Sequence, residues 1–327
     1  MSDSLQLSVV VPVYNEEESV DLLCQKLHDA VSVLKLRYEL VLVDDGSSDG
    51  TWDKLVANSR KLPCFKLIRF RRNFGQTAAM SAGFHAAEGE IVVTMDADLQ
   101  NDPVDIPKLL ERMDQGYDVV SGWRKNRQDT FINRKLPSML ANGLISKMTG
   151  VALHDYGCTL KAYRKEIIKD VHLYGEMHRF IPALANWVGG KVDEVVVSHH
   201  ARQFGKSKYG ISRTFKVILD LMTVKFLLQY STRPIQIFGK IGLMFGGIAT
   251  LMLAYVLFDW LFIPHTIENA FLVKRPFWVI TPLMLYAFCI QFISMGLLAE
   301  MQIRTWHESQ NKPIYKVREV VESPRAS

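Results

Sequence analysis

Two long apolar stretches in the last third of the 327-residue chain constrain its fold most strongly. Residues 241–258 carry no charge, and residues 277–299 are interrupted only by uncharged polar residues such as Gln291. Each stretch is long enough to cross a hydrocarbon layer of about 30 Å, which takes roughly 20 helical residues. The alternative is a pair of buried core helices, but a very large core would be needed to cover both. The sequence therefore predicts a transmembrane hairpin.

The charges beside the hairpin predict its orientation. The basic residues on the flanks next to the main domain are Arg233, Lys240, Arg304, Lys312, Lys316 and Arg318. The connecting loop holds only Lys274 and Arg275, which Glu268 partly offsets. Because cytoplasmic flanks are enriched in Lys and Arg, we expect the main domain and both termini in the cytoplasm.

The remaining composition agrees with this placement. No basic segment precedes an apolar run at the N-terminus, so no cleaved signal peptide is expected. The four cysteines show neither metal-ligand spacing nor a disulfide framework, which predicts reduced thiols in a reducing compartment. The net charge of +5 is modest, and no nucleic-acid partner is expected.

The chain divides into six expected segments. They are a main domain at 1–210, an interfacial amphipathic helix at 211–232, a first transmembrane helix at 233–263, a loop at 264–276, a second transmembrane helix at 277–300 and a tail at 301–327. The amphipathic segment mixes apolar residues with Arg213, Lys216 and Lys225, as interfacial helices do. An ordinary helix packed on the domain is the alternative for this segment.

Short apolar strands alternate with longer amphipathic segments in the main domain. Strands are expected at 7–13, 38–43, 65–70, 90–95 and 118–122, and helices at 17–35, 51–61, 76–87 and 103–115. This alternation predicts an α/β fold with a mainly parallel, doubly wound sheet. Ligands bind beyond the carboxyl ends of such strands.

Three polar clusters follow strand ends and predict one shared site there. They are Tyr-Asn-Glu at 14–16, Asp-Asp-Gly-Ser at 44–47, and Asp-Ala-Asp-Leu-Gln at 96–100. Asn15 also fits a helix N-cap and the second cluster fits a plain turn, so neither is specific alone. Asp96 and Asp98 are expected to project to the same side of a strand, where their paired charges need a cation such as Mg²⁺ or Mn²⁺.

Two basic clusters suit anionic ligands. The first contains Arg124, Lys125, Arg127, Arg134 and Lys135, and the second contains Arg202, Lys206 and Lys208 between Gly205 and Gly210. Arginine binds phosphate oxygens in bidentate fashion, so the first cluster suits a phosphate and the second a diphosphate. Solvated surface charges, or attraction to anionic lipid, are the alternatives.

Together these motifs resemble glycosyltransferase family two, whose members have the GT-A fold, here a mixed sheet. The hairpin and the motif at 96–100 narrow the resemblance to the polyprenyl-phosphate group, which is similar to dolichol-phosphate mannose synthase. It spans nearly the whole chain, from residue 7 to about residue 314. Asn-Arg-Gln-Asp at 126–129 and Asp-Tyr-Gly-Cys at 155–158 resemble most the bacterial undecaprenyl-phosphate 4-deoxy-4-formamido-L-arabinose transferases, which act in lipid A modification and polymyxin resistance.

The resemblance implies roles for individual residues. It implies UDP-sugar contacts at Pro12, Tyr14, Glu16, Asp44, Asp96, Arg202 and Lys206, metal ligation at Asp96, Asp98 and Gln100, acceptor-phosphate contacts at Arg124, Arg127 and Arg134, and catalytic roles for Asp155 and Arg202. Because a phosphate acceptor is already anionic, Asp155 is expected to orient groups or to act as a weak base.

The expected activity is inverting transfer of a sugar from a UDP-sugar to undecaprenyl phosphate at the bacterial inner membrane. The expected partners are donor, acceptor, membrane lipid and further copies of the chain in a homotetramer; the loop at 264–276 would be periplasmic. Alternatives are transfer of glucose, mannose or an N-acetylhexosamine for O-antigen or cell-wall modification, a processive polysaccharide synthase, or a membrane adaptor with a degenerate nucleotide domain. The chain lacks a Gln-x-x-Arg-Trp acceptor signature and retains Asp44, Asp96, Asp98 and Arg202, which disfavours the last two.

Overall fold

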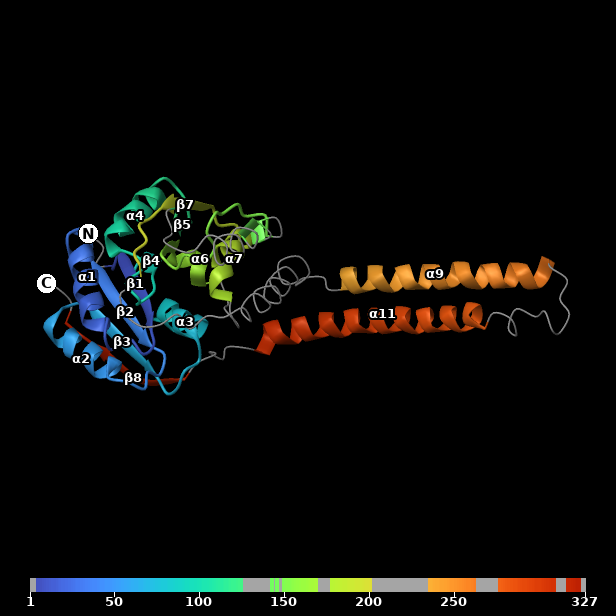
Figure 1. Ribbon diagram of the computed structural model, residues 1–327, viewed down its shortest axis with the longest axis horizontal. Coiled ribbons are helices and arrows are strands. Elements are labelled where there is room, and N and C mark those ends of the chain that lie inside the picture. Colours follow the sequence, from blue (N-terminus) through green and yellow to red (C-terminus); the bar gives the residue numbers. More distant parts are fainter. Residues whose placement is uncertain are drawn as a thin grey trace. The chain divides into compact units, whose positions relative to one another are not determined.

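The computed structural model describes residues 4–125, 142–143, 145–146, 149–169, 177–201, 235–262, 276–309 and 316–324. The chain forms two compact units (Figure 1). The first comprises Met1–Val224 with Pro313–Ser327, and the second comprises Lys225–Lys312. The predicted amphipathic helix at 211–232 and nearly all of the loop at 264–276 lie outside the described residues.

The first unit is built on one mixed sheet. In chain order its described strands are β1 (Leu7–Val13), β2 (Tyr38–Asp44), β3 (Phe65–Phe70), β4 (Ile91–Thr94), β5 (Val119–Trp123), β6 (Lys161–Arg164), β7 (Val192–Val196) and β8 (Val317–Glu322). Their order across the sheet is β7-β5-β6-β4-β1-β2-β3-β8. The central strands β4, β1, β2 and β3 run parallel, whereas β6 is antiparallel to β4 and β5, and β8 is antiparallel to β3. The predicted mixed α/β class is therefore confirmed.

Helices cover both faces of this sheet. They are α1 (Val20–Ser32), α2 (Thr51–Lys61), α3 (Gln76–Ala86), η1 (Pro103–Asp105), α4 (Ile106–Asp114), α6 (Lys165–Lys169), η3 (Met177–Phe180) and α7 (Ile181–Trp187). Apolar residues of α1, α2 and α4 share one core with alternate residues of β1, β2 and β3. Helix α3 packs on β1 and β2 from the other face (Figure 1). There Val10 lies against Gly83.

Strand β8 is an element that the sequence analysis missed. It follows the second apolar helix in sequence, yet it pairs with β3 at the edge of the sheet, with Leu67 opposite Val321. Backbone bonds extend the pairing, because Ser323 N donates to Phe65 O at 2.8 Å. The segment at 301–327, expected to be only a tail, thus contains a strand of the first unit.

The second unit contains the two long apolar helices, α9 (Ile235–Phe262) and α11 (Phe277–Ser309). Within them, Phe238–Phe262 and Phe277–Ala299 are long and apolar enough to cross a membrane. Most of their described side chains are exposed, among them Leu251 at 74%. Helices of a soluble core would be mostly buried, so this exposure favours the predicted membrane hairpin over the core-helix alternative.

Candidate active site

The loops after β1 and β2 are held together by reciprocal hydrogen bonds. Asn15 has a left-handed backbone with φ of 52°. Its backbone N donates to Ser47 Oγ at 2.9 Å, and its Oδ1 accepts from Ser48 N at 2.9 Å. Asn15 therefore bonds to the loop after β2 and does not cap α1, whose N-cap residue is Ser19. The N-cap alternative for Asn15 is therefore wrong, and α1 begins later than expected.

The predicted donor contacts on β1 lie around this loop pair. Pro12 is half-buried within the strand, and Tyr14 is 37% exposed just beyond it. Glu16 accepts from Ser19 Oγ at 2.7 Å through Oε2, and its backbone N donates to Thr51 Oγ1 at 2.9 Å. The three residues thus lie at the carboxyl end of β1 or just beyond it, as a ligand site at this edge requires.

Asp44 ends β2 and Asp45 follows it, and both carboxylates are buried. Asp44 Oδ1 accepts from Ser47 N at 3.0 Å, and Oδ2 lies 3.4 Å from Arg69 Nε. Burial raises the pKa of Asp44, while the bonds from Ser47 and the charge of Arg69 oppose that rise. Arg69 lies within β3, and nothing in the sequence pattern of that strand indicates a charged contact with Asp44.

Asp45 has a different set of partners. Its Oδ1 accepts from Phe74 N at 2.7 Å and its Oδ2 accepts from Gly75 N at 2.9 Å. Burial raises the pKa of Asp45 to about 6. The carboxylate thereby fixes the turn at Gly75, whose φ of 95° suits glycine, immediately before α3 begins at Gln76.

Asp96 and Asp98 lie in a bend after β4 and not on the strand itself. The strand ends at Thr94, and the bend includes Leu99 at φ of 58°. The predicted alternation of side chains along a strand therefore does not apply to this pair. Burial first and the charge of the neighbouring Asp98 second raise the pKa of Asp96 to about 6.

The donor set in this bend fits a hard divalent cation. Asp98 Oδ1 accepts from the backbone N of Gln100 at 3.2 Å, whereas the side-chain Nε2 of Gln100 lies 3.5 Å from the backbone oxygen of His200. The mutual repulsion of Asp96 and Asp98 is what a cation would relieve, and Mg²⁺ is commonly bound by one or two carboxylates plus substrate phosphates. Among the described residues, no group of three His, Cys, Asp or Glu side chains forms a metal cage. Two carboxylates would leave the other positions around such an ion to further ligands, as at Mg²⁺ sites completed by substrate phosphates.

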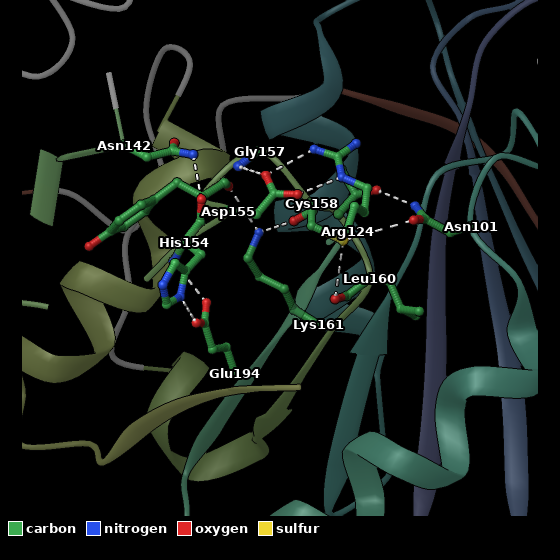
Figure 2. Close-up of polar contacts among 12 residues, drawn as sticks. Asn101, Arg124, Asn142, His154, Asp155, Gly157, Cys158, Leu160, Lys161 and Glu194 are labelled. Atoms are coloured by element: carbon green, nitrogen blue, oxygen red, sulfur yellow. Dashed lines mark hydrogen bonds and ion pairs between the residues drawn. The ribbon is translucent and has the colours of Figure 1, made fainter. Parts of the chain in front are cut away.

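Arg124 forms a bidentate ion pair with Asp155 (Figure 2). Arg124 Nε donates to Asp155 Oδ2 at 2.7 Å, and Gly157 N donates to Asp155 Oδ1 at 3.1 Å. Lys161 Nζ donates to the carbonyl oxygens of Tyr156 and Cys158 in the same loop. Burial lowers the pKa of Lys161 to about 8.

The Arg124 and Asp96 regions share one edge of the sheet. Thr94 at the end of β4 and Ser121 of β5 both pair with Lys161 of β6, so the segments that carry Asp96 and Arg124 leave the sheet at the same edge. The positive charges of Arg124 and Lys161 oppose the rise in the pKa of Asp96. The other predicted acceptor residues, Arg127 and Arg134, and the predicted donor residues Arg202 and Lys206 lie outside the described residues.

Two histidines near this edge, His154 and His200, contact carboxylates. His154 contacts Glu194, and its ring stacks on Trp123 with centroids 4.2 Å apart. His200 Nε2 lies 3.0 Å from Asp102 Oδ2. The four cysteines are free thiols, as predicted.

Comparison with known proteins adds the family. Residues 8–172 match the model of glycosyl transferase family 2. A dodecaprenyl-phosphate galacturonate synthase of Rhizobium johnstonii is 47% identical over 97% of this chain and 93% of its own length. An undecaprenyl-phosphate 4-deoxy-4-formamido-L-arabinose transferase of Photorhabdus laumondii is 37% identical over 97% of this chain and 94% of its own length.

Solved structures support the fold. The crystal structure of glucosyl-3-phosphoglycerate synthase from Mycobacterium tuberculosis with Mn²⁺, uridine diphosphate and glucosyl-3-phosphoglycerate matches with a TM-score of 0.53 at 17% identity. It covers 68% of this chain and 80% of the synthase. The shared architecture is the GT-A-like mixed sheet. The chain therefore belongs to glycosyl transferase family 2, within the group of polyprenyl-phosphate glycosyltransferases.

Proposed function

We propose that this enzyme transfers a sugar, with inversion, from a UDP-sugar to a polyprenyl phosphate, undecaprenyl phosphate in the first instance. One observation carries the proposal: the Asp96–Asp98 pair follows β4 and Arg124 follows β5, and both strands end at the same edge of the sheet, since Thr94 and Ser121 both pair with Lys161. An anionic acceptor and a metal-bound diphosphate would meet at such a site. The named relatives, which act on dodecaprenyl and undecaprenyl phosphate, support the acceptor class.

The reaction needs one bond made and one broken. A phosphate oxygen of the acceptor attacks the anomeric carbon, and the bond from that carbon to the diphosphate oxygen breaks to release UDP. Asp44 is proposed to accept a hydrogen bond from the ring N–H of uracil, and Arg124 to orient the acceptor phosphate. Asp96, Asp98 and Gln100 would hold Mg²⁺ or Mn²⁺, which supplies positive charge to the leaving diphosphate. Arg202 and Lys206 are proposed to contact that diphosphate, and Arg127 and Arg134 the acceptor.

The two apolar helices and the lipid-linked relatives indicate a protein of the bacterial inner membrane. We propose that the first unit and both termini are cytoplasmic, as the basic flanks of the hairpin predict. The phosphate of the acceptor lies at the membrane surface. A hairpin that anchors the domain to the same membrane raises the effective concentration of this phosphate at the domain.

Two sugars are candidates. The 47% identity to a galacturonate synthase favours galacturonic acid. The motifs at 126–129 and 155–158, with relatives at 37–38% identity, favour 4-deoxy-4-formamido-L-arabinose, with a role in lipid A modification. The two sugars differ in charge, since the first carries a carboxylate, so product mass distinguishes them directly.

The decisive experiment is mass spectrometry of the lipid formed from undecaprenyl phosphate and a panel of UDP-sugars that includes both candidates and UDP-glucose. We expect one candidate to yield a glycosylated lipid and free UDP. Asp98→Ala should abolish transfer while leaving the protein folded, and Asp114→Ala, an exposed acid at the end of α4, should not. Retained turnover in Asp98→Ala would refute the metal role, and no product from any UDP-sugar would refute the reaction class.

A further inference from the structure

Gln76 makes a direct contact with the Asp96 carboxylate. Its Nε2 donates to Asp96 Oδ1 at 2.7 Å across a sequence separation of 20 residues. The bond occupies one carboxylate oxygen from the side of α3. Because groups that hydrogen-bond a ligating carboxylate fix its orientation and tune its affinity for a cation, this amide is placed to govern how Asp96 meets an ion.

Gln76 is itself held by the turn that precedes it. It is the first residue of α3, and the turn at Phe74 and Gly75 donates both of its backbone N–H groups to the buried Asp45 carboxylate, at 2.7 and 2.9 Å. Both bonds end on one side chain at the end of β2. The start of the helix is therefore fixed to the sheet edge that carries Asp44.

The body of α3 has no room to shift. Residues 77–84 are all buried. A Cβ at Gly83 would lie only 2.1 Å from Val10 Cγ1, which shows that the helix packs directly on β1. Thr77 Oγ1 also lies 2.9 Å from His178 Nδ1 of η3. A helix fixed at both its start and its face holds its first side chain within the narrow range that a binding site requires.

We propose that Gln76 is a positioning residue that holds the Asp96 carboxylate in the orientation for cation binding, and that Asp45 holds Gln76 in place. The inference rests on the proposed metal-dependent function. It adds a contact network that runs from β2 through the start of α3 to the bend after β4. Neither Gln76 nor Asp45 needs to touch the ion.

The test is calorimetric titration of Mn²⁺ into the full-length protein in detergent with UDP present, without any transfer reaction. Gln76→Met keeps the side-chain length and removes the donor, and we expect Mn²⁺ binding to weaken about tenfold. Gln25→Met is the matched control, because Gln25 Nε2 makes the same kind of bond to Asp29 at 2.9 Å on the exposed surface of α1. We expect the control to bind Mn²⁺ like the wild type.

Asp45→Asn supplies a second variant that acts on the same contact from the other end. The amide keeps the shape of the side chain but replaces one acceptor oxygen by an NH₂ group facing a backbone N–H, which loosens the turn. We expect weaker Mn²⁺ binding, and no further weakening when Asp45→Asn is added to Gln76→Met, because both act on one contact.

Failure of the Gln76 inference and failure of the proposed metal-dependent function give different results. If a folded Gln76→Met protein binds Mn²⁺ with an affinity within twofold of the wild type, the inference is overturned. If Gln76→Met does not fold, wild-type affinity for Mn²⁺ in Asp45→Asn overturns it instead. A wild-type protein that binds UDP equally well with and without Mn²⁺ overturns the proposed metal role instead.

Discussion

The Arg124 guanidinium donates hydrogen bonds to both oxygens of the Asp155 carboxylate, with Nε 2.7 Å from Oδ2 and Nη2 3.0 Å from Oδ1. The pair is well shielded from solvent, since the two side chains are 13% and 4% exposed. A carboxylate that accepts two bonds from arginine and one from Gly157 N is already committed as an acceptor. This geometry favours an orienting role for Asp155 over the alternative of a weak base.

Arg124→Lys and Asp155→Asn should impair transfer to a similar extent. Lysine keeps the positive charge but lacks the planar guanidinium that binds both carboxylate oxygens, and asparagine cannot form the ion pair. In either variant the cationic group at position 124 is no longer held in place. We expect kcat to fall roughly 100-fold in each, and the double variant to be no worse than either single variant. Steady-state kinetics with saturating donor would measure this.

Asp193→Asn is the control for that prediction, because it removes the partner of Arg112 in an ion pair away from the site and should leave kcat unchanged. If Asp155 were the base, Arg124→Lys would retain most of its activity while Asp155→Asn lost it. That pattern would contradict the orienting role.

The raised pKa of Asp45 predicts a pH-dependent stability difference between the wild type and Asp45→Asn. Its folded pKa of about 6 lies above the ordinary value of 3.8 because of burial, so the folded state holds the proton more tightly than the unfolded state. The carboxyl's contribution to stability is therefore fully present below pH 3.8 and is lost as the pH rises through 6. We expect the free energy of unfolding of the wild type, relative to Asp45→Asn, to fall by roughly 2–3 kcal/mol between pH 4 and pH 7.

Denaturant unfolding in detergent at several pH values would measure this difference. Other titrating groups are common to both proteins and cancel in the subtraction. A difference that is constant with pH, or that grows as the pH rises, would show that burial does not raise the pKa of Asp45.

The pairing of β8 with β3 predicts that Asp in place of either of two neighbouring valines of β8 changes the free energy of unfolding by different amounts. Val321 is partly buried against the core of the first unit, whereas Val320 is 52% exposed. Asp in place of Val321 would place a carboxylate against that core, so Val321→Asp should lower the free energy of unfolding by roughly 1–3 kcal/mol, and Val320→Asp should have little effect. Thermal unfolding of both variants would compare them. Equal effects would indicate that β8 does not pack as described.

Much of the first unit could be predicted from its periodicity. The strand at 65–70 and the helix at 51–61 have the predicted bounds, because the apolar run or amphipathic period changes sharply at each end. The short strands β6 and β7 were missed. β6 spans four residues and begins with the buried Lys161, so its pattern does not resemble a buried strand. β8 was missed because its residues are mostly exposed and its partner is more than 200 residues away.

The site could be predicted in part for a related reason. Acids that follow an apolar strand are visible in sequence, so Asp44, Asp96 and Asp98 were identified. Their partners Arg69 and Gln76 were not identified, because they act through contacts that only the folded sheet brings together. Gln76 sits in a segment predicted simply as helical, and nothing in its local pattern indicates a partner 20 residues later.

Close packing in the hairpin leads to the last prediction. A Cβ at Gly242 of α9 would lie 3.0 Å from the backbone oxygen of Cys289 on α11, whereas a Cβ at Gly247 would meet nothing within 4 Å. Small residues let membrane helices approach closely, so Gly242→Leu should force the helices apart and lower stability in detergent by roughly 1–3 kcal/mol. Gly247→Leu gains the same helix propensity without the clash and should be neutral or stabilising. Thermal unfolding in detergent would compare the two variants, and equal loss in both would show that the helices do not pack through Gly242. The Thr250 and Tyr286 hydroxyls, 2.8 Å apart, also link these helices. Thr250→Val should therefore lower the stability of the Gly242→Leu protein further only if the two helices still touch in that protein.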